Sequence, residues 1–110
     1  MIDINNVDEM RRLVEQATPV YALVSTGNSE LTVVETEVEN CNFFFSRSSL
    51  VPTDNPSYKI TYNMSQPLGI YYDEVSAVMD LYTNYYPYYN GASTKRLIEL
   101  YKVVYPELMV

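Results

Sequence analysis

Residues 20–39 read VYALVSTGNSELTVVETEVE, and this stretch decides the expected fold. Two runs rich in β-branched and apolar residues flank Gly27-Asn28-Ser29, and Gly and Asn tolerate the positive φ of a tight turn. The pattern therefore predicts a β-hairpin whose strands lie at about residues 20–26 and 31–39.

Two further strands are expected after this hairpin. Residues 43–47 (FFFSR) are rich in β-formers, and residues 58–64 place large apolar side chains at every second position. Residues 48–57 contain two prolines with Asp and Asn, which is typical of an irregular loop. The predicted sheet therefore has four antiparallel strands.

Helical spacing marks both ends of the chain. Apolar residues recur every three or four positions over residues 6–17, where Asn6 and Glu9 match a capping box. A second helix is expected to begin at Asp73 and to end before Pro87, and a third to begin at a Ser93 cap and to end near residue 105. The inward residues of the third helix are expected to be Leu97, Leu100, Tyr101 and Val104.

These elements predict an α+β fold. One N-terminal and two C-terminal helices pack on a four-stranded antiparallel sheet, in the order α-β-β-β-β-α-α. The length of 110 residues is typical of one globular domain, so residues 1–110 are expected to form a single domain.

The composition excludes several kinds of catalytic and metal site. The chain has no His and one Cys, so it cannot build a Ser-His-Asp or Cys-His constellation or a common zinc site alone. Three scattered glycines do not form a phosphate-binding loop. We therefore expect no enzyme activity, no metal and no cofactor, and we expect Cys41 to be a small buried or half-buried residue and not a nucleophile. A pair of carboxylates is the remaining catalytic alternative, although no spacing singles one out.

The same counts indicate a location and argue against direct binding to nucleic acid. The N-terminus lacks the basic and apolar stretches of a signal peptide, and no apolar run reaches the ~20 residues of a membrane span. Seven scattered cations give no basic stripe for a nucleic-acid backbone. The expected location is the cytoplasm, that of the host cell if the protein is phage-encoded.

Negative charge is concentrated near the N-terminus. The net charge is −7, and residues 1–39 hold eight acidic against two basic residues. Glu35, Glu37 and Glu39 alternate along the expected strand, so they would project from one face at ~6.6–6.8 Å intervals. The core-facing set on the other side would be Thr32, Val34, Thr36 and Val38.

Two interpretations of this acidic row stay open. In the first, it meets a basic surface that normally holds nucleic acid, with carboxylates standing in for phosphates. In the second, it is a solvated strand face that keeps the chain soluble and discourages edge pairing.

Tyrosine is the second candidate contact residue. The chain has 12, and those at 82, 85 and 86 continue an apolar helical stripe and are expected to be partly core. Tyr88 and Tyr89 follow Pro87 in a loop, where no periodicity requires burial. Tyrosine gives large contact area with one polar group, as binding surfaces favour.

The short, acidic, Tyr-rich profile is similar to that of phage anti-defence proteins and toxin-neutralising immunity proteins, in composition and not in any alignable motif. We expect a non-enzymatic inhibitor of a basic, nucleic-acid-processing protein. The candidate contact residues are Glu30, Glu35, Glu37, Glu39, Tyr71, Tyr72, Tyr88 and Tyr89.

Two alternatives belong to other classes. A small-ligand binding or sequestering domain would have a concave pocket lined by Tyr. A homo-oligomer would use the Tyr stripe and the C-terminal Leu108-Met109-Val110 as its interface.

Overall fold

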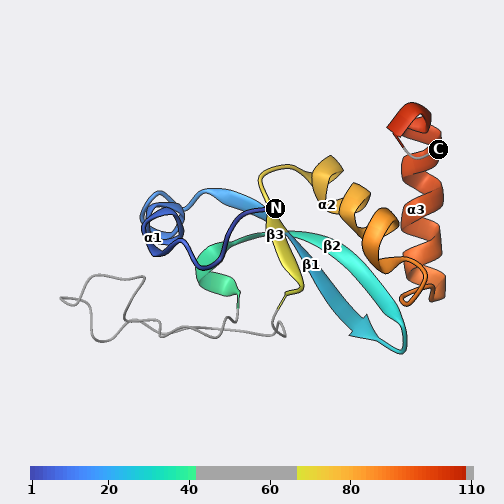
Figure 1. Cartoon of the computed structure of the whole chain (residues 1–110), viewed down its shortest axis with the longest axis horizontal. Helices are drawn as coiled ribbons and strands as arrows, with labels where there is room; N and C mark the ends of the chain where they lie inside the picture. Colours follow the sequence, from blue (N-terminus) through green and yellow to red (C-terminus); the bar gives the residue numbers. More distant parts are fainter. Residues whose placement is uncertain (42–66, 109–110) are drawn as a thin grey trace.

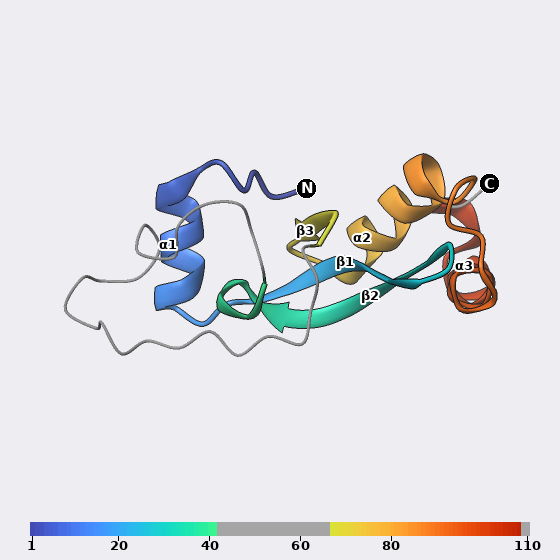
Figure 2. The ribbon, with the colours of Figure 1, turned by 90° about the horizontal axis from the view of Figure 1, so that it is seen from below.

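The sheet at the centre of the molecule has three antiparallel strands in the order β2-β1-β3 (Figure 1). The computed structural model describes residues 1–41 and 67–108. The elements are α1 (Val7–Glu15), β1 (Pro19–Gly27), β2 (Glu30–Glu37), β3 (Gly69–Tyr71), α2 (Glu74–Asp80) and α3 (Ala92–Val104). Figures 1 and 2 show α1 and α3 toward opposite ends of the molecule.

The expected four-stranded sheet, with the order α-β-β-β-β-α-α, is wrong: over residues 1–41 and 67–108 the sheet has three strands, within an α+β fold with three α-helices. The strands expected at residues 43–47 and 58–64 lie outside the described residues. The third strand is β3, which pairs with β1 from Tyr21↔Tyr71 to Leu23↔Gly69. Three residues are too few to produce a periodic pattern, so periodicity could not predict β3.

The predicted hairpin is confirmed. β1 and β2 pair from Pro19↔Glu37 to Gly27↔Glu30. The turn residues Gly27, Asn28 and Ser29 have positive φ of 111°, 31° and 61°. Glycine and asparagine adopt this region at little cost, so the local sequence fixes where the chain reverses.

The start of α1 is also as expected. The Asn6 side chain accepts a hydrogen bond from the Glu9 N–H at 3.2 Å, which caps the helix. The Glu9 carboxylate accepts from Arg12 Nε at 3.1 Å, within the same helix. The helix buries Met10 and Leu13 against the sheet.

Helices cover both faces of the sheet, which creates two hydrophobic cores. The α1 core joins α1 to the even-numbered side of β1; it contains Ile2, Met10, Leu13, Val20, Ala22, Val24, Val38, Cys41 and Ile70. The tyrosine core joins α2 and α3 to the odd-numbered side; it contains Leu23, Leu31, Tyr71, Ala77, Val78, Leu81 and Ile98, with tyrosines packed around them. β1 is therefore buried on both faces, which explains its continuous apolar sequence.

The helix expected before Pro87 forms in two parts. Asp73 caps the start of α2, and its carboxylate accepts from the Ser76 N–H at 2.8 Å. A π-helical turn at Leu81–Tyr85 then follows, with the Tyr86 N–H bonded to the Leu81 carbonyl at 2.8 Å. Tyr82, Tyr85 and Tyr86 pack partly buried against the tyrosine core, as predicted.

The inward face of α3 differs from the prediction. Thr94 and Ile98 are buried and Leu97 and Tyr101 are half-buried, whereas Leu100 and Val104 are 58% and 57% exposed. The Thr94 hydroxyl hydrogen-bonds the backbone of Leu31, and this contact sets the rotation of the helix on the sheet. An apolar side of α3 is therefore left facing outward.

Candidate binding surface on the edge of strand β2

Among the described strands β2 lies at the edge of the sheet, and no described residue pairs with part of its outer side. The Leu31 N–H donates to Thr94 Oγ1 at 2.7 Å, and that hydroxyl donates to the Leu31 carbonyl at 2.8 Å. Both backbone groups of every second residue in an antiparallel strand point to the same side, so Val33 and Glu35 also face outward. No group in the described part of the chain bonds their backbone on that side.

Glu35 and Glu37 flank this open edge. Glu35 is exposed and Glu37 half-buried, and they lie opposite Tyr21 and Pro19 of β1. Within residues 1–41 and 67–108, neither carboxylate forms an ion pair. Two neighbouring carboxylates without a cation repel one another, so a positively charged group brought to this edge is stabilised.

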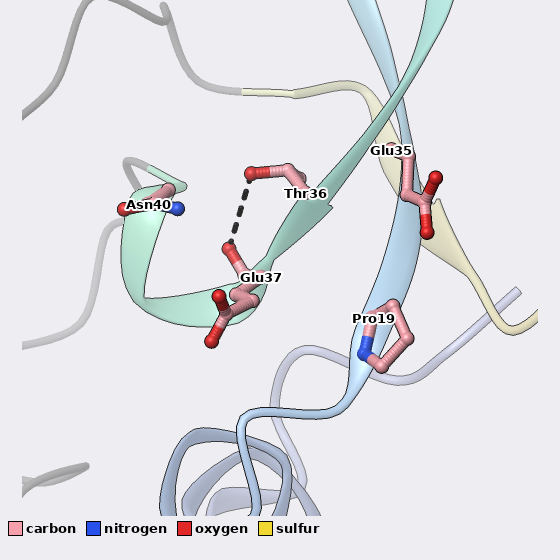
Figure 3. Close-up of a pocket in the computed structure, with 5 residues that line it drawn as sticks. All are labelled: Pro19, Glu35, Thr36, Glu37 and Asn40. Carbon is pink, nitrogen blue, oxygen red and sulfur yellow. Dashed lines mark hydrogen bonds between the residues drawn. The ribbon is translucent and has the colours of Figure 1, made fainter.

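A shallow open depression of about 310 Å³ lies beside these carboxylates (Figure 3). Within it, the Thr36 hydroxyl donates to the backbone carbonyl of Glu37 at 3.5 Å. This bond does not use the side-chain carboxylate of Glu35 or of Glu37. Its lining is polar apart from one ring and consists of Pro19, Glu35, Thr36, Glu37 and Asn40. A surface of this shape suits the side chains of a partner better than an enclosed small molecule.

The expected row of three glutamates is not formed. β2 ends at Glu37, and Val38–Asn40 form a 3₁₀ turn that carries Glu39 off the strand. Val38, the first residue of this turn, is 1% exposed and lies in the α1 core. Of the expected core-facing set, Val38 lies in the α1 core and Val34 packs against it. The other side of the strand is covered too, since Leu31 lies in the tyrosine core and Val33 packs against it.

Glu30 lies at the other end of β2. It packs against Gly91, where an added Cβ would lie 2.1 Å from Glu30 Cγ. The Gly91 N–H also donates to the Ser29 carbonyl at 2.8 Å, which ties the start of α3 to the hairpin tip. Glu35 lies five positions after Glu30, a distance of about 17 Å at the usual rise of a strand.

The four candidate tyrosines have different environments. Tyr71 is 2% exposed and its hydroxyl donates to Asp80, so it is a core residue and has no surface to offer a partner. Tyr72 is 52% exposed, and its hydroxyl bonds the Glu9 carboxylate of α1. Tyr89 is half-buried with its ring edge-on to Tyr85, whereas Tyr88 is 76% exposed. Tyr88 is therefore the most accessible of the four.

The candidate residues do not form one surface. Glu35 and Glu37 lie at the C-terminal end of β2, Glu30 lies by the hairpin tip, and Tyr72 lies against α1. The sequence reasoning missed Pro19, Thr36 and Asn40, which line the depression. Thr36 and Asn40 are polar and lie next to the candidate glutamates in the sequence. That adjacency could have predicted that they belong to the same surface.

Burial of Tyr71 predicts a loss of stability in alkali. Burial first, and then the bond to Asp80, raise the pKa of this hydroxyl well above the usual 10.0. Above about pH 10 the unfolded chain therefore releases a proton that the folded chain retains, so stability falls by about 1.4 kcal/mol per pH unit from this group. Urea unfolding at pH 9 to 11.5 measures the slope, and Tyr71→Phe is expected to reduce it. An unchanged slope in that variant would contradict the assignment.

Other chemistry at the described residues is limited. Burial raises the pKa of the Cys41 thiol to about 12, so it is protonated at neutral pH and a poor nucleophile. The prediction that Cys41 is buried is confirmed, at 5% exposure. No group of three or more acidic or Cys residues in residues 1–41 and 67–108 is placed to hold a metal ion.

No protein-family model matches this chain, and no curated protein or solved structure is detectably similar to it. None of the helices in the described ranges has the length and apolar composition that crossing a membrane requires. Function is therefore inferred from the geometry of this chain.

Proposed function

We propose that this chain is a non-enzymatic acidic protein that binds and blocks a basic partner, a protein that processes nucleic acid. The observation that carries the proposal is the open edge of β2, where Glu35 and Glu37 form no ion pair with a described residue. A basic side chain placed there relieves the repulsion between the two carboxylates.

The charge of the whole chain supports such a partner. With a net charge of −7, of which residues 1–39 contribute −6, the chain attracts a cationic surface over a distance of several ångströms. Complementary fields of this kind raise the rate of encounter and fix the orientation of docking. The Glu35–Glu37 end of β2 is then the place where the partner arrives.

The backbone of β2 supplies the second half of the interaction. The outward-facing groups of Val33 and Glu35 can accept an extended segment as an additional strand. The added strand contributes main-chain hydrogen bonds, and its basic side chains lie beside the carboxylates. An extended basic segment thus satisfies both features of this edge.

The class of partner follows from its charge. Proteins that act on nucleic acid carry clusters of Lys and Arg that neutralise phosphates. Because Glu39 lies off the strand, only two carboxylates of the expected row, Glu35 and Glu37, remain on β2. This arrangement supports binding to a basic surface and does not support mimicry of a row of phosphates. An immunity protein that neutralises a basic toxin would use the same contacts. The two roles differ only in the identity of the basic partner.

A tagged pull-down from the native host lysate, with and without nuclease, identifies the partner. We expect one basic protein in both samples, because the contact does not require nucleic acid. Recovery that disappears after nuclease treatment, or an acidic partner, contradicts the proposal. The alternative of a solvated edge predicts no specific partner at all.

The double variant Glu35→Gln, Glu37→Gln is expected to slow association with that partner about three- to tenfold at low ionic strength, and less at high salt. Stopped-flow or surface-plasmon measurements over a salt series give the rates. The matched control is Asp8→Asn, Glu15→Gln, which removes the same charge from exposed positions on α1. Equal slowing in both variants would show that total charge, and not the β2 edge, drives binding.

A further inference from the structure

Asn90 and Gly91, which immediately precede α3, form the only Asn-Gly pair in the chain. Asn90 is exposed, and Gly91 is the N-cap residue of the helix. An asparagine followed by glycine is the pair most prone to deamidation, because glycine has no side chain to hinder attack by its backbone nitrogen on the preceding amide. This pair is therefore a place where the chain can modify itself.

The reaction needs no enzyme and no reagent other than water. The Gly91 nitrogen loses its proton and attacks Cγ of Asn90, so that a C–N bond forms, the bond to the side-chain nitrogen breaks and ammonia leaves. Water then opens the resulting succinimide ring at either carbonyl. One product has aspartate at position 90. The other has isoaspartate, in which the backbone runs through the side chain and is one methylene longer.

The fold holds the attacking nitrogen in a hydrogen bond. The Gly91 N–H donates to the Ser29 carbonyl at 2.8 Å, and Figures 1 and 2 show the start of α3 beside the tip of the β1–β2 hairpin. While this bond is formed, the carbonyl retains the proton that the nitrogen must lose, and the peptide plane is held in place. The reaction therefore waits until the start of α3 moves away from the hairpin tip.

Two further contacts keep Gly91 at the hairpin tip. Glu30 packs against it so closely that an added Cβ would lie 2.1 Å from Glu30 Cγ, so a larger residue would displace this side chain. One turn later, the buried Thr94 hydroxyl bonds both the N–H and the carbonyl of Leu31. Packing thus favours glycine at position 91, and the Thr94 bonds limit how often the start of α3 is released.

We propose that Asn90 is a site of spontaneous deamidation, gated by release of the start of α3 from the hairpin tip. Isoaspartate lengthens the backbone before Gly91 and shifts its N–H relative to the Ser29 carbonyl, so a chain that has reacted holds α3 less firmly. The site lies by the hairpin tip, at the end of β2 opposite Glu37, so the inference does not rest on the proposed partner binding.

Incubation at mildly alkaline pH, followed by peptide mapping with mass spectrometry, tests the site. We expect position 90 to convert to aspartate and isoaspartate at a rate at least tenfold lower in the folded chain than in the same chain unfolded in urea. Asn28, which precedes Ser29 in the exposed hairpin turn, is the internal control and should react much more slowly than Asn90 in urea. Equal rates at position 90 in the folded and unfolded chains, or no conversion in either, overturn the proposal.

Two variants separate local release from global unfolding. Thr94→Val removes the hydroxyl that ties α3 to Leu31, and we expect it to speed conversion at position 90 several-fold under conditions that keep the chain folded. Leu13→Ala is the matched control, because it lowers stability from the α1 core on the other face of the sheet. Equal acceleration in both variants would show that global unfolding exposes the pair, and would overturn the local gate.

The effect of the longer backbone is measured on the reacted chain itself. Isoaspartate chains separated by chromatography are expected to unfold at a lower temperature than unreacted chains. Asn90→Asp is the control, since it adds the same charge without lengthening the backbone, and it should leave the midpoint closer to that of the wild type. Equal midpoints for the isoaspartate and Asn90→Asp chains would overturn the proposed weakening of the contact between Gly91 and Ser29.

Discussion

Thr94→Val is expected to lower the free energy of unfolding by roughly 2–5 kcal/mol, although the two side chains have the same shape. The Thr94 hydroxyl is fully buried and bonds both the N–H and the carbonyl of Leu31, itself 0% exposed. Valine leaves two buried backbone groups without partners, and each costs about 1–3 kcal/mol. Chemical denaturation monitored by circular dichroism measures the loss.

The control for this prediction is Thr94→Ser, which keeps the hydroxyl and removes one methyl group. Its expected loss is about 1 kcal/mol, from the missing apolar contact. If serine and valine destabilise equally, packing and not hydrogen bonding fixes α3 on β2. Hydrogen exchange at the Leu31 amide adds a local readout, since its protection should fall much more in the valine variant.

Local features of the fold could be predicted because a few neighbouring residues determine them. The hairpin follows from Gly27 and Asn28, which accept positive φ, and the start of α1 follows from Asn6, which caps its first turn. Both depend on contacts within about four residues. The sequence reports such contacts directly.

Features that depend on distant contacts could not be predicted in the same way. The strand β3 exists because Gly69–Tyr71 pair with β1, which is nearly fifty residues earlier in the chain. The outward direction of Leu100 and Val104 depends on the bond between Thr94 and Leu31, again across the fold. α3 carries more apolar residues than one face can hold, so periodicity alone does not choose the buried face.

The candidate site shows the same division. Alternation correctly placed Glu35 and Glu37 on one side of a strand, because a strand's side chains alternate whatever covers it. It failed for Glu39, because the strand ends at Glu37 and a 3₁₀ turn begins at Val38, a change that the alternating pattern does not reveal. The open backbone of Val33 and Glu35 depends on strand order, which the hairpin sequence does not contain.

The two-core architecture predicts different consequences for two chemically identical substitutions. Leu13 and Leu23 are both 0% exposed, but Leu13 lies in the α1 core and Leu23 in the tyrosine core. Leu13→Ala and Leu23→Ala are each expected to lower the free energy of unfolding by about 2–5 kcal/mol. Urea unfolding followed by far-UV circular dichroism gives both values.

The near-UV signal of tyrosine should separate these two variants. Among the described residues, the tyrosines packed in a core all belong to the tyrosine core, around Leu23. A cavity at Leu23 loosens those rings and is expected to reduce the near-UV signal of the native state, whereas a cavity at Leu13 lies across the sheet and should leave it near the wild-type value. Equal loss in both variants would mean that the sheet does not separate two cores. The matched change of Leu to Ala makes the location of the cavity the only difference between them.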